Sequence, residues 1–128
     1  MTFVVKIEKT GGPEVLKFET IKLAKPDTEE VLIEHRAIGL NYIDIYHRSG
    51  LYPVELPSGI GAEGSGVIKQ IGSKVKDFSV GDRVAYAGAP LGAYSSERIY
   101  PTKNLIQIPD YINFEIAATL MTKGLTTY

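Results

Sequence analysis

Glycine and proline interrupt this sequence at short intervals, and that spacing limits what the chain can fold into. The 128 residues include 13 glycines and 7 prolines, with short runs rich in valine, isoleucine, tyrosine and phenylalanine between them. Such runs favour strands, and turn residues at this spacing favour an all-β sandwich or barrel. Because the connections are too short for the crossovers of a parallel sheet, the sequence predicts a mainly β fold with antiparallel neighbours.

Six or seven strands are expected. The clearest runs from Glu30 to Ile38, where Val31, Ile33 and Ala37 share one side of an alternating pattern that is typical of a half-buried strand. The other predicted strands cover residues 3–7, 16–23, 64–71, 82–87, 93–100 and 105–108.

Two segments break the β pattern and are predicted to be helical. Asn41 can cap a helix over residues 42–49, because its side-chain oxygen can accept from first-turn amides, and Gly50 is placed to end that helix. Asn113 can likewise cap a helix over residues 114–121, and residues 123–128 form a second helical segment. No stop residue follows, so we expect the chain to be interrupted there.

The composition excludes several classes of function. The net charge is −1 and the basic residues are scattered, which argues against nucleic-acid binding. No apolar run is long enough to span a membrane, and no secretion signal begins the chain, so cytoplasm is the default location. With no cysteine and only two histidines, we expect neither a disulfide nor a metal site, and His35 stands alone on its strand.

Gly59 to Gly64 matches the pattern G-x-G-x-x-G, which binds a pyrophosphate where it joins a strand to a helix. A proline-rich loop precedes this match, and the residues after it, with two glycines and three β-branched side chains, make a poor helix. We interpret these glycines as a strand-entry turn with close backbone packing.

Residues 41–50 are the most suggestive segment, because they gather polar and aromatic side chains in one short helix. One interpretation makes Asn41 a cap and the tyrosines part of the core or its rim. The other makes the helix a wall of a small-molecule cleft, with polar tips facing a ligand. Arg48 can pair with a phosphate or with a surface carboxylate.

The stretch from Ala37 to Pro53 closely resembles quinone oxidoreductases of the zeta-crystallin type, in the medium-chain dehydrogenase/reductase superfamily. Residues 11–16, 57–68, 80–84, 92–95 and 123–126 resemble the same family. These blocks run in order along almost the whole chain, so their joint specificity is high.

The resemblance implies a GroES-like, partly open barrel over residues 1–112. Residues 113–128 would begin the inter-domain helices that lead to a Rossmann domain, which this chain lacks. NADPH, held in the cleft between the domains, would pass electrons to a quinone. Zinc-dependent relatives carry a cysteine and a histidine where this chain has Gly39-Leu40-Asn41 and Gly61-Ala62-Glu63, so no zinc is expected. Glu63 is interpreted as balancing charge within its glycine-rich turn.

The resemblance also assigns site residues. Asn41 would hydrogen-bond near the nicotinamide ribose, and Thr126 would approach the nicotinamide. The cofactor cleft would be lined by Tyr42, Ile43, Asp44, Ile45 and Tyr46. The candidate catalytic residues, which border the quinone, are Tyr46, Tyr52 and Arg48.

Three alternatives remain open: a zinc-free enoyl reductase acting on an activated alkene, a non-catalytic GroES-like module that assembles with itself or a partner, and an inactive remnant. For the leading hypothesis we expect a homodimer at full length. We expect the 128-residue chain alone to be inactive and to bind NADPH weakly or not at all, with Leu125 uncovered and favouring self-association.

Overall fold

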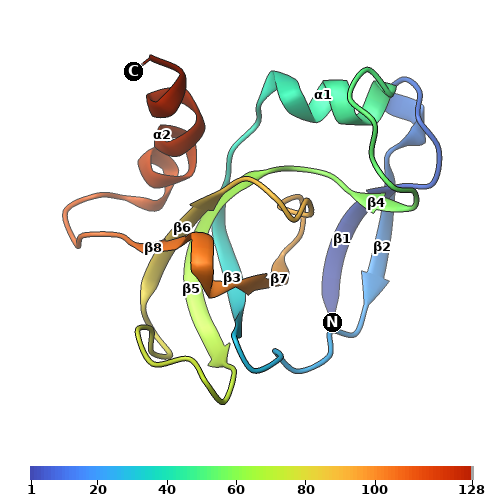
Figure 1. Cartoon of the computed structure of the whole chain (residues 1–128). Coiled ribbons are helices and arrows are strands. Elements are labelled where there is room, and N and C mark those ends of the chain that lie inside the picture. Colours follow the sequence, from blue (N-terminus) through green and yellow to red (C-terminus); the bar gives the residue numbers. More distant parts are fainter. Residues whose placement is uncertain (128) are drawn as a thin grey trace.

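The fold consists of two antiparallel sheets and two helices (Figure 1). The computed structural model describes the backbone of residues 1–127 and the side chains of residues 1–120. The strands are β1 (Thr2–Ile7), β2 (Lys17–Ile21), β3 (Glu30–Ile38), β4 (Ser58–Gly59), β5 (Glu63–Ile71), β6 (Arg83–Ala87), β7 (Glu97–Pro101) and β8 (Leu105–Gln107). The helices are α1 (Tyr42–Ser49) and α2 (Phe114–Thr127), with 3-10 turns η1 (Pro13–Val15) and η2 (Thr102–Asn104).

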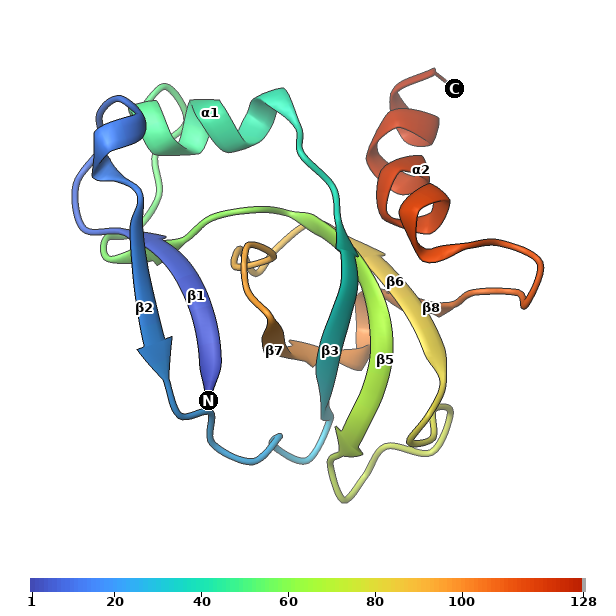
Figure 2. The same ribbon diagram turned by 180° about the vertical axis from the view of Figure 1, so that it is seen from behind.

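The smaller sheet has the strand order β2-β1-β4 and the larger one β7-β3-β5-β6-β8. Residues 94–96 join the two sheets, because the Val5 amide donates to the Tyr94 carbonyl at 2.8 Å and the Ser96 amide donates to the Phe3 carbonyl at 2.9 Å. The result is an open barrel, with α1 crossing one end and α2 lying beside the larger sheet (Figure 2). The fold class predicted from the sequence is confirmed, including the helix after the third strand.

The core forms where the alternating pattern places apolar side chains inside the barrel. Val31 and Ile33 of β3 are fully buried, as the alternation predicts. Leu32 is also nearly buried, and the pairing of β3 with β5 shifts register between Leu32 and Ile33. The main cluster consists of Val31, Ile33, Ile68, Val84, Tyr86, Ala93, Tyr100 and Leu105.

Three details differ from the sequence prediction. The strand expected over residues 93–100 begins only at Glu97, because Gly92 has a φ of +137° and the next residues bond to the turn at Gly61. The two-residue strand β4 was not predicted, since alternation cannot be seen over two residues. The C-terminal helical segments form one helix, with Gly124 inside it, although residue 128 lies outside the described part.

The glycine-rich match at residues 59–64 is a strand entry, as the sequence predicted. Gly59 ends β4, Gly61 adopts a φ of +99°, and Glu63 begins β5. Asn113 caps α2, because its side-chain oxygen accepts from the Ile116 amide at 2.8 Å. Among the described helices none is long and apolar enough to cross a membrane.

His35 is part of a hydrogen-bond network inside the barrel. Its Nδ1 donates to the Ser95 carbonyl at 2.7 Å, so its Nε2 accepts from the Tyr86 hydroxyl, also at 2.7 Å. The Arg98 guanidinium is buried, stacks near the rings of Tyr86 and Tyr100, and donates to the Pro90 carbonyl at 2.8 Å. Burial lowers the pKa of His35 to about 4, and the charge of Arg98 adds to this effect, while the bond to Ser95 opposes it.

This shift predicts that acid destabilises the fold through His35. The unfolded chain protonates His35 near its ordinary pKa of about 6.5, whereas the folded chain does so only near pH 4, so stability falls as the pH falls through this window. Between pH 7 and pH 5 we expect the unfolding free energy of the His35→Gln variant to fall by about 2 kcal/mol less than that of the parent chain. Denaturant titrations at both pH values would measure it. His47→Gln, at the other histidine, is the control, and equal pH dependence in the two variants would contradict the assignment.

Candidate functional site

Helix α1 begins and ends where its sequence places caps. Asn41 is the N-cap in an extended conformation, and Gly50 ends the helix in the left-handed region with a φ of 90°. Asp44 in the first turn and Arg48 in the last turn both complement the helix dipole. The helix predicted over residues 42–49 is therefore confirmed.

Asn41 is anchored to a buried carboxylate. Its Nδ2 donates to Oε1 of Glu63 at 2.9 Å, and the Gly39 amide donates to the Glu63 carbonyl at 2.9 Å. Glu63 is fully buried at the start of β5. A Cβ on Gly39 would collide with the carbonyl of Ala118 in α2, so only glycine permits this approach. The end of β3, the start of α1 and the first half of α2 therefore meet around Glu63.

The Asp44 carboxylate is buried and bonds to groups inside the protein. Only 3% of the residue is exposed. Its Oδ2 accepts from the Asn41 amide at 3.1 Å and from the Tyr94 hydroxyl at 2.6 Å. A side chain so placed supports the start of α1.

The opposite side of α1 is open and largely apolar. Tyr42 is 78% exposed and Ile45, one turn later, 43% exposed, while Leu40 just before the cap is 71% exposed. Ile43 is half-buried. Helical periodicity thus places Tyr42 and Ile45, two of the predicted cofactor-lining residues, on an exposed face and Asp44 on a buried one.

Tyr46 and Tyr52, both predicted to border the acceptor, lie side by side. Their ring centroids are 5.2 Å apart in an edge-to-face arrangement, and the Tyr52 amide donates to the Tyr46 carbonyl at 3.1 Å. His47 makes a further edge contact with Tyr52 at 6.3 Å. Tyr52 is exposed, so this aromatic pair is accessible at the end of α1 away from Asn41.

Arg48 and Thr126 complete the predicted set. The Nε of Arg48 donates to the Gly11 carbonyl at 3.2 Å, and the Gly11 amide donates to the Arg48 carbonyl at 2.9 Å, so this side chain holds the first loop against α1. The side chain of Thr126 lies outside the described residues. The cofactor and catalytic roles of all these residues stay predictions.

Two residues of the site, Tyr94 and Glu63, were not predicted to belong to it, and Glu63 was interpreted as charge balance within its turn. Their bonds to α1 join residues 50 and 22 positions apart, which no local pattern reveals. A partial indication was the glycine run at residues 59–64, because a glycine lets a neighbouring side chain pack directly against the backbone. A Cβ on Gly61 would lie 2.5 Å from the Tyr94 ring.

An apolar groove of about 470 Å³ runs from Leu40 along the gap between the two sheets. It is lined by Phe3, Val4, Val5, Phe18, Ile38, Leu40, Tyr94, Ser95 and Ser96. Leu40 and Tyr94 therefore belong both to the groove and to the surroundings of Asn41.

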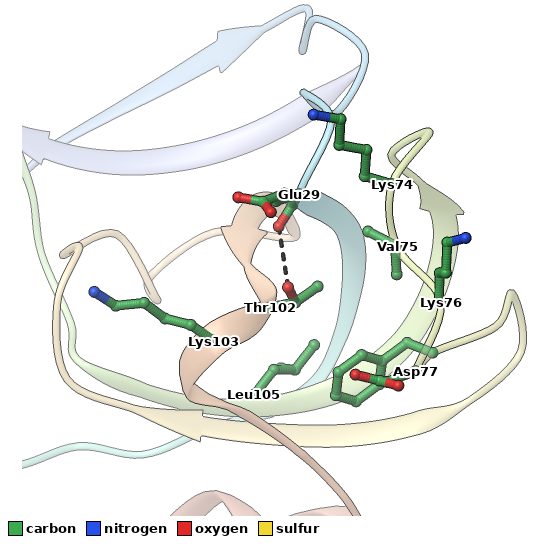
Figure 3. Close-up of a pocket in the computed structure, with 9 residues that line it drawn as sticks. Glu29, Lys74, Val75, Lys76, Asp77, Thr102, Lys103 and Leu105 are labelled. Carbon is green, nitrogen blue, oxygen red and sulfur yellow. Dashed lines mark hydrogen bonds between the residues drawn. The ribbon is translucent and has the colours of Figure 1, made fainter.

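A second hollow, of about 630 Å³, is lined by residues of η2 and of the β5–β6 loop. That loop lies at the end of the molecule away from α1 (Figure 1). Figure 3 shows that Lys74, Lys76 and Lys103 point away from one another around the hollow. Their charges do not converge on a common ligand. Among the residues whose side chains are described, no group of three or more His, Cys, Asp or Glu side chains could hold a metal ion.

Comparison with known proteins gives consistent matches. The family model "Alcohol dehydrogenase GroES-like domain" matches residues 27–110. A quinone oxidoreductase of Pseudomonas aeruginosa is 55% identical over 118 residues, which cover 91% of this chain and 36% of that protein. A 2-haloacrylate reductase of a Burkholderia species is 39% identical over 132 residues, which cover 98% of this chain and 40% of that protein.

Among solved structures, the quinone oxidoreductase of Escherichia coli complexed with NADPH superposes with a TM-score of 0.95 at 46% identity. The match covers all of this chain and 39% of that one. The chain thus spans well under half the length of the relatives it matches.

The contact between Gly61 and Tyr94 predicts unequal costs for two glycine substitutions. Gly61 and Gly81 have φ values of +99° and +95°, but a Cβ on Gly81 would meet nothing within 4 Å. We expect Gly81→Ala to cost about 1–2 kcal/mol from backbone strain alone, and Gly61→Ala to cost about 2 kcal/mol more because it also displaces the Tyr94 ring. Urea unfolding would measure both, and equal losses would contradict the packing described.

Proposed function

We propose, given that this chain belongs to the alcohol dehydrogenase GroES-like domain family, that it forms the acceptor-binding part of an NADPH-dependent quinone oxidoreductase. The proposal rests on the arrangement of side chains at the start of α1. Asn41 is fixed there by the buried Glu63, next to the exposed side chains of Leu40 and Tyr42. The NADPH complex of the Escherichia coli relative supports the choice of cofactor.

The residues at this surface suit a nicotinamide. The Nδ2 of Asn41 has two protons, and one bond to Glu63 leaves the other for a ligand oxygen. The exposed apolar side chains of Tyr42 and Ile45 offer a surface for a flat ring. When bound, NADPH supplies the hydride. In this proposal Asn41 orients the ribose next to the nicotinamide, and the Asp44 carboxylate holds Asn41 in place by accepting from its backbone amide.

Tyr46 and Tyr52 are proposed to border the quinone. Their edge-to-face contact fixes both rings, and a flat acceptor can stack against such a pair. Their hydroxyls can donate to quinone oxygens, on which a proton must arrive as the hydride adds to the ring. Quinones accept hydride without a Lewis acid, so the chemistry needs no metal. Arg48, held against the first loop, is proposed to border the quinone pocket and hold its wall.

A second candidate is the reduction of an activated alkene. The similarity to the 2-haloacrylate reductase favours it specifically, and an alkene conjugated to a carbonyl accepts hydride as a quinone does. The same residues at α1 would serve either acceptor, so only the acceptor distinguishes the two reactions.

The site for the pyrophosphate and adenosine is proposed to lie in a second domain, outside this chain. We therefore expect the 128-residue chain to bind NADPH with a dissociation constant well above the micromolar range. Calorimetric titration with NADPH would measure it. Micromolar binding would contradict the division of the cofactor site between two domains.

Acceptor preference tests the reaction itself. We expect a chimera in which this chain replaces the matching part of the Pseudomonas aeruginosa relative to oxidise NADPH faster with 1,4-benzoquinone than with a crotonyl thioester. The measurement is the loss of NADPH absorbance. Faster turnover with the thioester would favour the alkene reductase, and no turnover with either acceptor would contradict both.

Tyr52→Phe in this chimera provides a check on the proposed pocket. Loss of one hydroxyl donor is expected to lower kcat/KM for the quinone about tenfold, as one hydrogen bond of roughly 1.4 kcal/mol would. The matched control is Tyr111→Phe, at a tyrosine that is 88% exposed, which should leave kcat/KM unchanged.

A further inference from the structure

We propose that Tyr94 is a positioning residue for Asn41 and that it acts through the carboxylate of Asp44. This inference rests on the proposed function for its catalytic meaning, because Asn41 is there a cofactor ligand. The link itself is a chain of hydrogen bonds within the described residues. It runs from Tyr94 to Asp44, from Asp44 to Asn41, and from Asn41 to Glu63.

The backbone of Tyr94 is held from two sides. The amides of Gly92 and Ala93 donate to the Gly61 carbonyl at 2.9 and 3.1 Å, and the Tyr94 amide donates to the Ile60 carbonyl at 2.9 Å. On the other side, the Tyr94 carbonyl accepts from β1. The ring packs on the cluster of Ile7, Val15 and Ile60. These contacts therefore fix the position of the Tyr94 hydroxyl.

That hydroxyl meets the carboxylate that closes the first turn of α1. It donates to Oδ2 of Asp44 at 2.6 Å, and the same oxygen accepts from the Asn41 amide at 3.1 Å. Burial, together with the bond to Asp44, raises the pKa of Tyr94 well above its ordinary value. The phenol therefore stays protonated at neutral pH and remains a donor.

The Asp44 carboxylate depends on these two bonds. Its other oxygen, Oδ1, is buried and has no hydrogen-bond partner among the residues whose side chains are described. Without the Tyr94 hydroxyl, a buried carboxylate would keep the Asn41 amide as its single donor within this set, which costs much of its stabilisation. Movement of Asp44 would then loosen the N-cap, and with it the direction in which Asn41 presents its Nδ2.

The test is Tyr94→Phe in the 128-residue chain, which keeps the ring and its packing and removes only the donor. Nuclear magnetic resonance would follow hydrogen exchange at the Asn41 amide and the shifts of its Nδ2 group. We expect exchange at Asn41 to accelerate about tenfold or more, the factor that corresponds to losing a bond to a charged acceptor, with a changed Nδ2 resonance. Tyr111→Phe is the matched control.

Asp44→Asn keeps the test decisive if Tyr94→Phe does not fold. It preserves the shape of the side chain and removes the charge that strengthens both bonds, so a smaller change in the same direction is expected at Asn41. Unchanged Asn41 resonances and exchange in every variant that folds would overturn the proposal.

Kinetics in the chimera separate this inference from the proposed function. Tyr94→Phe is expected to raise KM for NADPH about tenfold while kcat changes less than about twofold, because the hydrogen bond supports binding geometry rather than the chemical step. If the Asn41 resonances change but KM for NADPH does not, the positioning by Tyr94 stands and the cofactor role of Asn41 is overturned.

Discussion

The burial of Glu63 is the constraint on which the site depends. A carboxylate taken fully out of water is stable only where donors meet it, and the side chain of Asn41 is one of these donors. This requirement fixes Asn41 relative to β5, and hence fixes where α1 starts. Gly39 lets α2 approach the same point, because any side chain there would collide with the Ala118 carbonyl. One buried group therefore sets the relative positions of a sheet and two helices.

Much of this architecture could be predicted from local sequence. The alternation in β3, the cap at Asn41 and the glycine at position 50 each act within a few residues, and the structure places each as expected. Residues 93–96 could not be predicted in this way. Their composition is that of a strand, but the amides of Ala93 and Tyr94 bond to the carbonyls of Gly61 and Ile60, a tertiary choice that overrides propensity.

The candidate site shows the same division. The resemblance assigned every residue from Tyr42 to Tyr46 to the cofactor cleft, and a helix turns consecutive side chains to different faces. Tyr42 and Ile45 face outward, whereas Asp44 points inward to a tyrosine 50 residues away. The sequence could therefore identify the segment, but only the long-range partners show which of its side chains are bonded inside the protein and which are exposed.

The irregular segment between Gly92 and β7 connects these features. Tyr94 reaches α1, the Ser95 carbonyl accepts from His35 inside the barrel, and Ser96 bonds to Phe3 of the smaller sheet. A regular strand would direct its backbone groups to neighbours on two sides only, whereas this segment serves three parts of the fold within three residues. Its departure from strand geometry, which begins at the positive φ of Gly92, is therefore what allows the barrel to support a helix at its rim.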